Sequence, residues 1–320
     1  MDITVLGCGR WGTFIAWYLE RINHNVILWG RNSSSNLKNL ITNRKNDFLS
    51  LPNSINITDN LELAIKSSNI IVISISAQNL RDFMKDIIKY NLSNKTLVLC
   101  MKGIEASSGK RLSQVVTEYI DTSLTKVAIW VGPGHVQDFI NDIPNCMVID
   151  SEDFNTKNML VNQFSSKMIR FYYGTDLIGN EIGAAAKNVI GIAAGMLDGI
   201  ELSSLKGALM SRGTREISRL IKAMGGNEFS AYGLCHLGDY QATLFSEHSQ
   251  NRKFGECIVT RKEYSKLAEG ASTTLALIKL GQIHNTDLPI CKAVNDVIYN
   301  NVDAKLAIDS LFLRSIKHEF

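Results

Sequence analysis

The sequence carries no excess of charge of one sign. Its 34 Lys and Arg residues nearly balance its 31 Asp and Glu residues, which leaves a formal net charge of +3 over 320 residues. The basic residues are scattered along the chain, whereas a nucleic-acid-binding domain typically gathers them on one face. The composition therefore gives no support for a nucleic-acid partner.

Long apolar runs are also absent. No stretch approaches the roughly 20 consecutive apolar residues that a membrane-spanning helix needs. The first residues, MDITVLG, enter a strand-like pattern at once and lack the charged and apolar regions of a signal peptide. We therefore expect a cytoplasmic protein with no integral membrane segment.

The six cysteines are widely spaced, and no Cys-x-x-Cys pair occurs. This pattern is typical of reduced, buried thiols in a cytosolic protein rather than of a disulfide framework. Cys235, His236, His248 and Cys257 fall in one stretch, but their spacing does not match a zinc site. We expect no bound metal.

The first half of the chain alternates short apolar runs with amphipathic segments. Runs that are apolar on both faces and joined by helices indicate a parallel sheet covered on both sides. The pattern therefore predicts an α/β Rossmann domain, doubly wound, with a mainly parallel sheet. The runs are ITVLG, NVILWG, NIIVISIS, KTLVLCMK, KVAIWVG and NCMVID, and the helical segments include GTFIAWYLERI, NLRDFMKDIIKY and KRLSQVVTEYI.

After about residue 176 the strand signal fades. The segments that follow, among them GNEIGAAAKNVIGIAAGMLDGI and SLKGALMSRGTREISRLIKAM, have the pattern of helices. We therefore predict two domains, a dinucleotide-binding Rossmann domain over residues 1–180 and an all-helical substrate-binding domain over residues 181–320.

A G-x-G-x-x-G pattern, GCGRWG at residues 7–12, directly follows the run ITVL and opens a helical segment. That context is typical of a dinucleotide-binding turn. Gly7 permits the tight turn, Gly9 lets the backbone approach the pyrophosphate, and Gly12 lets helix and strand pack closely. We expect the phosphates at the helix N-terminus, where free N–H groups and the helix dipole favour anions.

The end of the second apolar run bears on which dinucleotide binds. An NAD-selective site usually places Asp or Glu there, to bind the ribose 2′-hydroxyl. This chain has Trp29-Gly30-Arg31-Asn32 instead. Because Arg31 can accept a 2′-phosphate and tolerates its absence, we expect NADP(H), with NAD(H) as the alternative.

A single lysine, Lys187, lies in the apolar, small-residue segment GAAAKNVIGIAAG at residues 183–195. Burial there would lower the pKa of a lysine towards the range useful for acid–base chemistry, whereas a neighbouring carboxylate would keep it charged. A nicotinamide enzyme that reduces a ketone needs such a proton donor. On periodicity alone, a lysine that reaches solvent from a buried helix fits the pattern equally well.

A series of motifs extends this argument along the chain. They span residues 4 to about 275 and read GCGRWGT, MKGIE, VGPGH, GAAAKNVIGIAAGMLDG, GLCHLGD, SQNRKFG and AEG. With them the chain resembles the bacterial-type NAD(P)-dependent glycerol-3-phosphate dehydrogenases. The resemblance implies a Rossmann domain followed by an all-α domain of the 6-phosphogluconate dehydrogenase C-terminal type. It also implies reversible NAD(P)H-dependent reduction of dihydroxyacetone phosphate to sn-glycerol 3-phosphate, which supplies glycerophospholipid synthesis.

The resemblance assigns roles to individual residues. Lys187 matches the family's catalytic lysine, the acid and base at the substrate C2 oxygen, and Lys102 matches a second active-site lysine that contacts substrate and cofactor. Asp239 matches the carboxylate that orients the reacting lysine and the substrate hydroxyls. The other substrate-binding positions are Gly132, Gly134, Ser249, Gln250 and Asn251. The cofactor-binding positions are Gly7, Gly9, Arg10, Trp11, Gly12, Arg31, Lys102, Val136, Gln250, Leu267 and Glu269.

Two positions depart from the family's pattern. Gly134 stands where the family usually has Ser or Thr, so a side-chain hydroxyl is missing. Gln250 stands where the family has Arg, which normally reaches both phosphate and cofactor. Losing a charged hydrogen bond to an anion costs about 1.5–3 kcal/mol, or roughly ten- to a hundredfold in binding. Arg252, just beyond, is a candidate to compensate.

Two other interpretations stay open at the level of the sequence. One is a related two-domain hydroxy-acid dehydrogenase with a 6-phosphogluconate-like or ketopantoate-like substrate. The other is a catalytically weakened NAD(P)H-binding regulator, which only the changes at Gly134 and Gln250 support. The resemblance further implies a homodimer. Arg212, Arg215 and Arg219 share one face of a predicted helix and could guide an anionic substrate or contact a second subunit.

Overall fold

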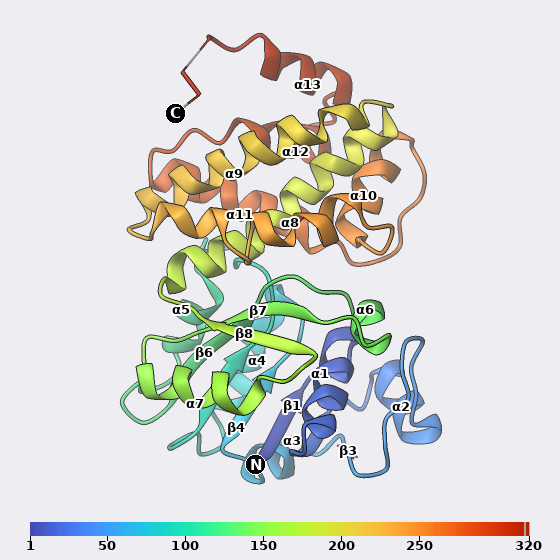
Figure 1. Cartoon of the computed structure of the whole chain (residues 1–320), viewed down its shortest axis with the longest axis vertical. Helices are drawn as coiled ribbons and strands as arrows, with labels where there is room; N and C mark the ends of the chain where they lie inside the picture. Colours follow the sequence, from blue (N-terminus) through green and yellow to red (C-terminus); the bar gives the residue numbers. More distant parts are fainter. Residues whose placement is uncertain (317, 320) are drawn as a thin grey trace. The chain divides into compact units, whose positions relative to one another are not determined.

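The computed structural model describes residues 1–316, 318 and 319, and it divides into two compact units. The first unit comprises residues 1–102 and 110–177, and the second comprises residues 103–109 and the chain from residue 178 onward. Each unit has its own hydrophobic core. The first unit contains the strands, and the second is built of helices (Figure 1).

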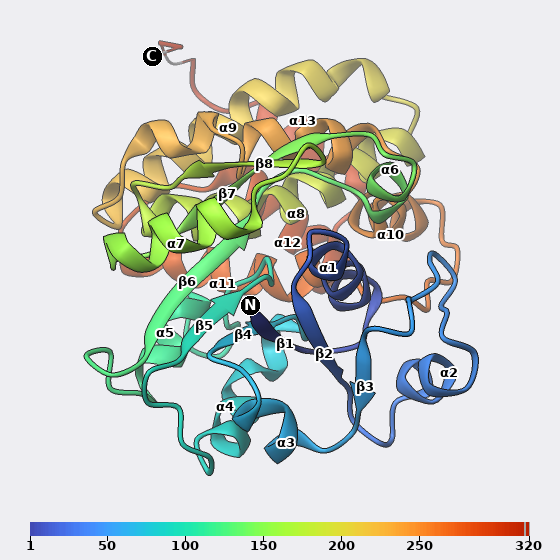
Figure 2. The ribbon, with the colours of Figure 1, turned by 60° about the horizontal axis from the view of Figure 1, so that its bottom comes forward.

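The strands of the first unit form one sheet in the order β3-β2-β1-β4-β5-β6-β7-β8. Neighbours pair in parallel, except that β6 and β7 are antiparallel. Figure 2 shows β1 between β2 and β4, where the strand order reverses. In doubly wound folds, ligands bind beyond the carboxyl ends of the strands at such a reversal. The strands are β1 (Asp2–Leu6), β2 (Asn25–Trp29), β3 (Asn56–Thr58), β4 (Ile70–Ile73), β5 (Thr96–Leu99), β6 (Lys126–Val131), β7 (Asn145–Asp150) and β8 (Ile169–Tyr173).

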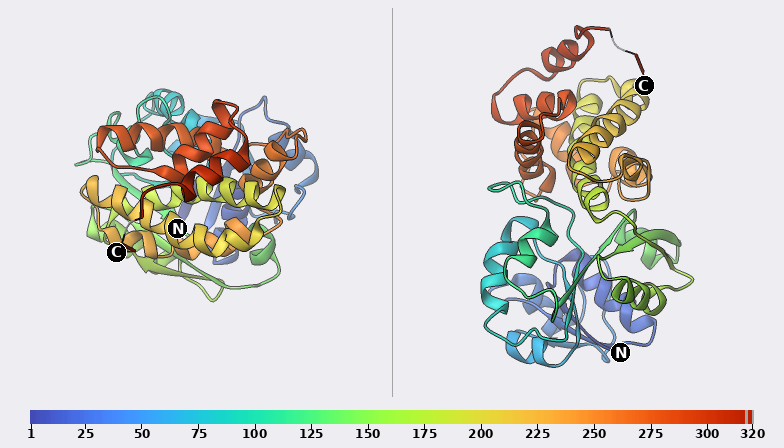
Figure 3. Two further views of the ribbon diagram at one scale, coloured as in Figure 1. Left: turned by 90° about the horizontal axis from the view of Figure 1, so that it is seen from above. Right: turned by 90° about the vertical axis from the view of Figure 1, so that its left-hand side faces the viewer.

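Helices cover both faces of this sheet. In the right-hand view of Figure 3, α4 and α5 lie on one side, and α1 and α7 lie on the other. On the α1 side, Phe14 and Tyr18 of α1, Trp130 of β6 and Phe164 of α7 are almost completely buried together. The helices of the first unit are α1 (Arg10–Arg21), α2 (Ser35–Asn43), α3 (Leu61–Lys66), η1 (Ala77–Asn79), α4 (Leu80–Ile87), α5 (Leu112–Thr117), α6 (Val136–Ile140) and α7 (Phe154–Phe164).

The predicted Rossmann domain with a mainly parallel sheet is confirmed. Each of the six apolar runs forms a strand, because its side chains are buried along its length or nearly so. Two strands were not among the predicted runs. Strand β3 has only three residues, with one strongly polar position, and β8 alternates buried and exposed residues as a strand at the sheet edge does.

The second unit is all-helical, as predicted. Its central helix is α8 (Leu177–Gly199), in which every residue from Gly179 to Leu197 is buried. A helix that is apolar all round must lie inside a bundle, and here other helices of the unit surround α8 (Figure 1). The remaining elements are η2 (Ser203–Leu205), α9 (Lys206–Ala223), η3 (Glu228–Tyr232), η4 (Leu237–Asp239), η5 (Gln241–Phe245), α10 (Gln250–Val259), α11 (Glu269–Ile283), α12 (Pro289–Tyr299) and α13 (Ala304–Phe312).

Two features are not found in the part of the chain that the structure describes. None of its helices combines the length and the apolar character needed to cross a bilayer. No group of three or more His, Cys, Asp or Glu side chains there is arranged to hold a metal ion.

Candidate active site

The G-x-G-x-x-G segment forms the turn between β1 and α1 in the first unit. The turn is very tight, since a Cβ on Gly12 would lie 1.8 Å from the carbonyl oxygen of Gly7. Gly7 itself has φ +120° and packs against the backbone of Ser74, just after β4. Helix α1 therefore starts directly at the point where the strand order reverses.

Three features of this turn fit a bound pyrophosphate. A Cβ on Gly9 would meet no atom within 4 Å, so the space beside this residue is open. Gly9 is the N-cap of α1 and supplies no side chain, so the free N–H groups of the first turn face no side-chain cap. The indole Nε1 of Trp11 is buried and has no acceptor among the described residues, which leaves it available to donate to a ligand.

Arg31, Lys102 and Gly132 follow the carboxyl ends of β2, β5 and β6, on the same edge of the sheet as the glycine turn. Arg31 is exposed two residues after β2, beside the start of α2 at Ser35. The ammonium of Lys102 donates to the carbonyl oxygen of Gly132 at 2.5 Å. The parallel sheet thus gathers three predicted site residues that are far apart in the sequence.

Gly134 is explained by its surroundings in the first unit. It has φ +146°, and a Cβ there would lie 2.4 Å from the ring of Phe139 in α6. A Ser or Thr at this position would clash unless the ring moved, so the missing hydroxyl reflects how α6 packs. Nearby, Val136 is buried.

Arg10, another predicted cofactor residue, is held by neighbours of the first unit. Its guanidinium donates to the side-chain oxygen of Gln137 and lies 4.6 Å from the ring centroid of Phe48. Burial lowers the pKa of Arg10. The side chain is therefore fixed beside the glycine turn rather than extended into solvent.

In the second unit, Lys187 and Asp239 form a buried ion pair. The ammonium of Lys187 lies 2.5 Å from Oδ2 of Asp239, and their side chains are only 9% and 1% exposed. Lys187 also donates to the hydroxyl of Thr243 at 3.0 Å. The lysine does not reach solvent from its helix, and it points at a carboxylate that lies 52 residues away in the sequence.

Glycines on α8 let these partners approach. Gly183, Gly191 and Gly195 share a helix face with Lys187 because they lie four residues apart along it. A Cβ on Gly191 would lie 2.7 Å from the side chain of Thr243, and one on Gly195 would lie 1.8 Å from the carbonyl oxygen of Arg252. Much of this small-residue surface is therefore occupied by the chain's own η4, η5 and α10.

Thr243 was not among the predicted residues, although it contacts Lys187. It is 3% exposed and lies in η5, a short π-helical turn of a kind that often occurs at functional sites. Its position four residues after Asp239 is the one signal that the sequence offers, since that spacing places two side chains on the same face of a helical turn.

Ser249, Gln250 and Asn251 lie at the N-terminus of α10. Ser249 is the N-cap and accepts a hydrogen bond from the backbone N–H of Arg252. The side-chain oxygen of Asn251 accepts from the N–H of Gly270 at 2.9 Å, and its Cβ faces Gly191 one turn beyond Lys187. Ser249 and Asn251 are thus fixed near the turn of α8 that carries the catalytic candidate.

Gln250 and Arg252 both have side-chain partners within the second unit. The side-chain oxygen of Gln250 accepts from the hydroxyl of Tyr264 at 3.0 Å. The guanidinium of Arg252 lies 2.6 Å from Asp198, eleven residues after Lys187 on α8. Burial of Asp198 is outweighed by hydrogen bonds from Lys206, Ser203 and Arg252, which lower its pKa. Arg252 is therefore committed to a structural ion pair.

The last two cofactor candidates precede and begin α11. Leu267 is 65% exposed, and Glu269 is the first residue of the helix. The backbone oxygen of Glu269 accepts from the hydroxyls of Ser272 and Thr273. Both candidates follow Tyr264, whose hydroxyl donates to Gln250.

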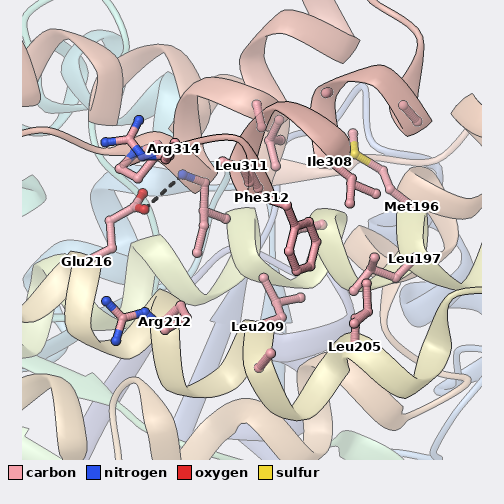
Figure 4. A pocket seen from close by; sticks show the side chains of 18 of the residues that line it. Met196, Leu197, Leu205, Leu209, Arg212, Glu216, Ile308, Leu311, Phe312 and Arg314 are labelled. Atoms are coloured by element: carbon pink, nitrogen blue, oxygen red, sulfur yellow. Dashed lines mark hydrogen bonds between the residues drawn. The ribbon is translucent and has the colours of Figure 1, made fainter. Parts of the chain in front are cut away.

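A cavity of about 570 Å³ lies elsewhere in the second unit, among α8, α9, α12 and α13 (Figure 4). Its lining is largely apolar, as at Leu311 and Phe312, and it includes Arg212 and Arg219. None of the predicted catalytic, cofactor-binding or substrate-binding residues is among the described residues that line it. The carboxylate of Glu216 accepts there from the backbone N–H groups of Ile290 at 2.8 Å and Cys291 at 2.9 Å. Burial raises the pKa of Glu216 to about 7.

Comparisons with known proteins show the family of the chain. A family model described as the NAD-dependent glycerol-3-phosphate dehydrogenase N-terminus matches residues 2–157, and the model of the same family's C-terminus matches residues 176–309. Over its full length the chain is 33% identical to a glycerol-3-phosphate dehydrogenase [NAD(P)+] of Thermoanaerobacter sp. and 35% identical to one of Chlorobium phaeobacteroides. In each case 99% of the relative is covered.

Solved structures show the same fold. The crystal structure of a glycerol-3-phosphate dehydrogenase from Coxiella burnetii matches with a TM-score of 0.91 at 24% identity, over 98% of this chain and 99% of that one. A PanE/ApbA family ketopantoate reductase from Ralstonia eutropha matches with a lower TM-score of 0.61 at 11% identity, over 97% of this chain and 99% of that one. The architecture is thus shared by dehydrogenases of different substrates.

Proposed function

Because this chain belongs to the NAD-dependent glycerol-3-phosphate dehydrogenase family, we propose that it uses NADPH or NADH to reduce dihydroxyacetone phosphate reversibly to sn-glycerol 3-phosphate. The observation that carries the proposal is the buried Lys187–Asp239 pair, with Nζ and Oδ2 2.5 Å apart. A buried, charged lysine held by a carboxylate is the proton donor that ketone reduction needs.

In the proposed reaction Lys187 is the general acid. Its ammonium hydrogen-bonds the C2 oxygen of the ketone and transfers a proton to that oxygen as the alcohol forms. The bound reduced nicotinamide supplies the hydride that adds to C2. Asp239 keeps Lys187 charged before the transfer, and Thr243 fixes its direction through the 3.0 Å hydrogen bond. A proton from solvent then restores the ammonium.

The other predicted residues divide between cofactor and substrate. We assign the pyrophosphate to the turn of Gly7, Gly9 and Gly12, with Trp11 Nε1 as an additional donor. We assign to Lys102 the role of placing a positive charge near the developing alkoxide, because preorganised charge there stabilises the transition state.

For the substrate phosphate we assign Ser249, Asn251 and the N-terminus of α10, since a helix N-terminus favours anions. Because position 250 is glutamine and not arginine, we propose that phosphate binding relies on neutral hydrogen-bond donors, namely side chains and backbone N–H groups.

Restoring the family arginine should strengthen substrate binding. We expect Gln250→Arg to lower the KM for dihydroxyacetone phosphate by about tenfold with little change in kcat, because a charged hydrogen bond to an anion is gained. Steady-state kinetics at fixed NADPH measures this. Gln241→Arg adds the same charge at an exposed position of η5 and should leave KM unchanged. An unaltered KM in Gln250→Arg would show that position 250 does not reach the phosphate.

We propose a preference for NADPH, supported by Arg31 after β2. Arg31→Ala should raise the KM for NADPH about tenfold and that for NADH less than twofold, because only NADPH has a 2′-phosphate. Initial rates with both cofactors test this. Arg21→Ala removes another partly exposed arginine, which pairs with Asp142, and should change neither value. Equal effects of Arg31→Ala on the two cofactors would contradict the assignment.

We further propose that the protein acts in the cytoplasm as a homodimer and supplies glycerophospholipid synthesis. These proposals rest on the family membership and on the absence of membrane-spanning helices among the described residues. Size-exclusion chromatography with light scattering tests the dimer. The activity itself is tested by the loss of NADPH or NADH absorbance with dihydroxyacetone phosphate. Tight NADPH binding without turnover would instead support a related substrate or a regulator.

A further inference from the structure

His236 and Tyr240 form a hydrogen-bonded pair inside the second unit, next to the proposed catalytic residues. His236 is completely buried, with Nδ1 2.9 Å from the carbonyl oxygen of Gly183 and Nε2 2.7 Å from the hydroxyl of Tyr240. A carbonyl oxygen only accepts, so Nδ1 carries the proton and donates to Gly183. Nε2 is then the acceptor for the tyrosine hydroxyl. Burial lowers the pKa of His236 to about 4, so the ring is neutral near pH 7.

His236 is connected to both members of the Lys187–Asp239 ion pair. Gly183 lies four residues before Lys187 in α8, so in helical geometry its carbonyl also accepts the backbone N–H of Lys187. His236 is the N-cap of η4, the short turn that ends at Asp239. The hydrogen bond from His236 to Gly183 therefore joins the helical turn of α8 that ends at Lys187 to the short turn η4 that ends at Asp239.

The packing around His236 keeps it in this position. Gly183 has no side chain, and a Cβ there would lie 3.0 Å from the Cβ of His236. The rings of His236 and Tyr240 meet edge to face, with centroids 4.9 Å apart. Tyr240 in turn packs against Gly213 of α9, where a Cβ would lie 3.4 Å from the Tyr240 hydroxyl. The pair is thus held from α8 on one side and from α9 on the other.

We propose that His236, fixed by Tyr240, is a positioning residue for the reduction. Its hydrogen bond to Gly183 holds η4 against α8 and keeps Oδ2 of Asp239 at 2.5 Å from Nζ of Lys187. This inference rests on the proposed function, because it concerns the geometry of the proposed acid. Being neutral, the ring adds no second cation to compete with Lys187 for the carboxylate.

The test compares three variants with the wild-type enzyme. His236→Leu introduces an apolar side chain of similar size and loses both hydrogen bonds. We expect kcat to fall about 10- to 100-fold, as for a small misplacement of a catalytic group. KM for dihydroxyacetone phosphate and the NADPH dissociation constant should change less than threefold. His236→Asn retains a donor near the Nδ1 position and should recover most of kcat. Tyr240→Phe, which preserves the packing, should lower kcat several-fold.

A pH profile separates positioning from mere loss of stability. In His236→Leu the alkaline limb of kcat should move to lower pH, because a buried ammonium with a weaker counter-charge gives up its proton more readily. Glu216→Gln is the matched control, since it weakens a buried contact of the same unit without touching Lys187. It should lower the melting temperature but leave kcat and the profile unchanged.

The outcomes are distinguishable. If the wild-type enzyme turns over dihydroxyacetone phosphate and His236→Leu has the same kcat and pH profile, the positioning role is overturned and the proposed function is not. If His236→Leu fails to fold, an unchanged kcat and pH profile in Tyr240→Phe would overturn the positioning role. No wild-type turnover with dihydroxyacetone phosphate would overturn the proposed function, and the inference with it.

Discussion

Replacing Lys187 with methionine is expected to lower kcat for dihydroxyacetone phosphate by about 10³-fold or more, within the range that a general acid contributes. NADPH binding should change less than twofold, because the proposed pyrophosphate site belongs to the first unit. Steady-state kinetics gives kcat, and a fluorescence titration gives the NADPH dissociation constant. A folded variant that loses NADPH binding, or retains wild-type turnover, would contradict the role of Lys187.

Two further variants separate chemistry from stability in this experiment. Lys187→Met leaves Asp239 buried without its cation, which can cost about 3–5 kcal/mol of folding free energy. Lys187→Arg keeps the charge, but a guanidinium hardly gives up its proton, so kcat should still be strongly reduced. Lys206→Met is the control, because Lys206 is a similarly buried lysine of the same unit that pairs with Asp198 at 2.7 Å. Its kcat should stay within about threefold of wild type.

The sequence predicts well those parts of the fold and site that depend on short-range pattern. Apolar runs of four to eight residues predict strands because both faces of a covered parallel sheet are buried. The glycine turn at residues 7–12 is equally local, since one strand, one turn and one helix define it. Lys187 stands out for the same reason, as one charge among small apolar residues.

What the sequence leaves unpredicted depends on contacts between distant residues. The pairing of Lys187 with Thr243 requires η5 to approach α8 at Gly191, and no local period signals that approach. The commitment of Arg252 to Asp198 is likewise invisible in the motif, where Arg252 looked free to bind phosphate. From the sequence, Gly134 indicates only that a hydroxyl is missing. The structure gives a reason for the glycine, because the ring of Phe139 packs where a side chain would lie.

The glycines of α8 connect the local sequence pattern with the contacts between distant residues. In the sequence they mark a helix surface that another group can approach closely. In the structure the approach is made at Gly183 by His236, the N-cap of η4, and at Gly191 and Gly195 by η5 and α10. Asp239 and Thr243 are brought beside Lys187 as a result, and Asn251 lies against Gly191, one turn further along α8. Small residues on one helix thus assemble a polar site from parts of the chain that are 50 or more residues away.

A second large effect is expected at the glycine turn of the first unit. Gly9→Val should raise the NADPH dissociation constant by about 100-fold, close to 2.7 kcal/mol, while the melting temperature changes by less than about 2 °C. Gly9 has φ −73° and ψ −175°, an extended conformation that valine adopts readily. A Cβ there meets no protein atom within 4 Å, so the added methyl groups fill only the space assigned to the pyrophosphate.

Gly12→Ala supplies the contrast, because it should disturb the packing of the same turn and not only its ligand. Its Cβ would lie 1.8 Å from the carbonyl oxygen of Gly7, a backbone atom that cannot move aside without displacing α1 from β1. We expect a lower melting temperature as well as weaker binding. Thermal unfolding and NADPH titration of both variants separate the two roles. If Gly9→Val binds NADPH as tightly as the wild type, the open space beside Gly9 does not hold the pyrophosphate, and the assignment of this turn is wrong.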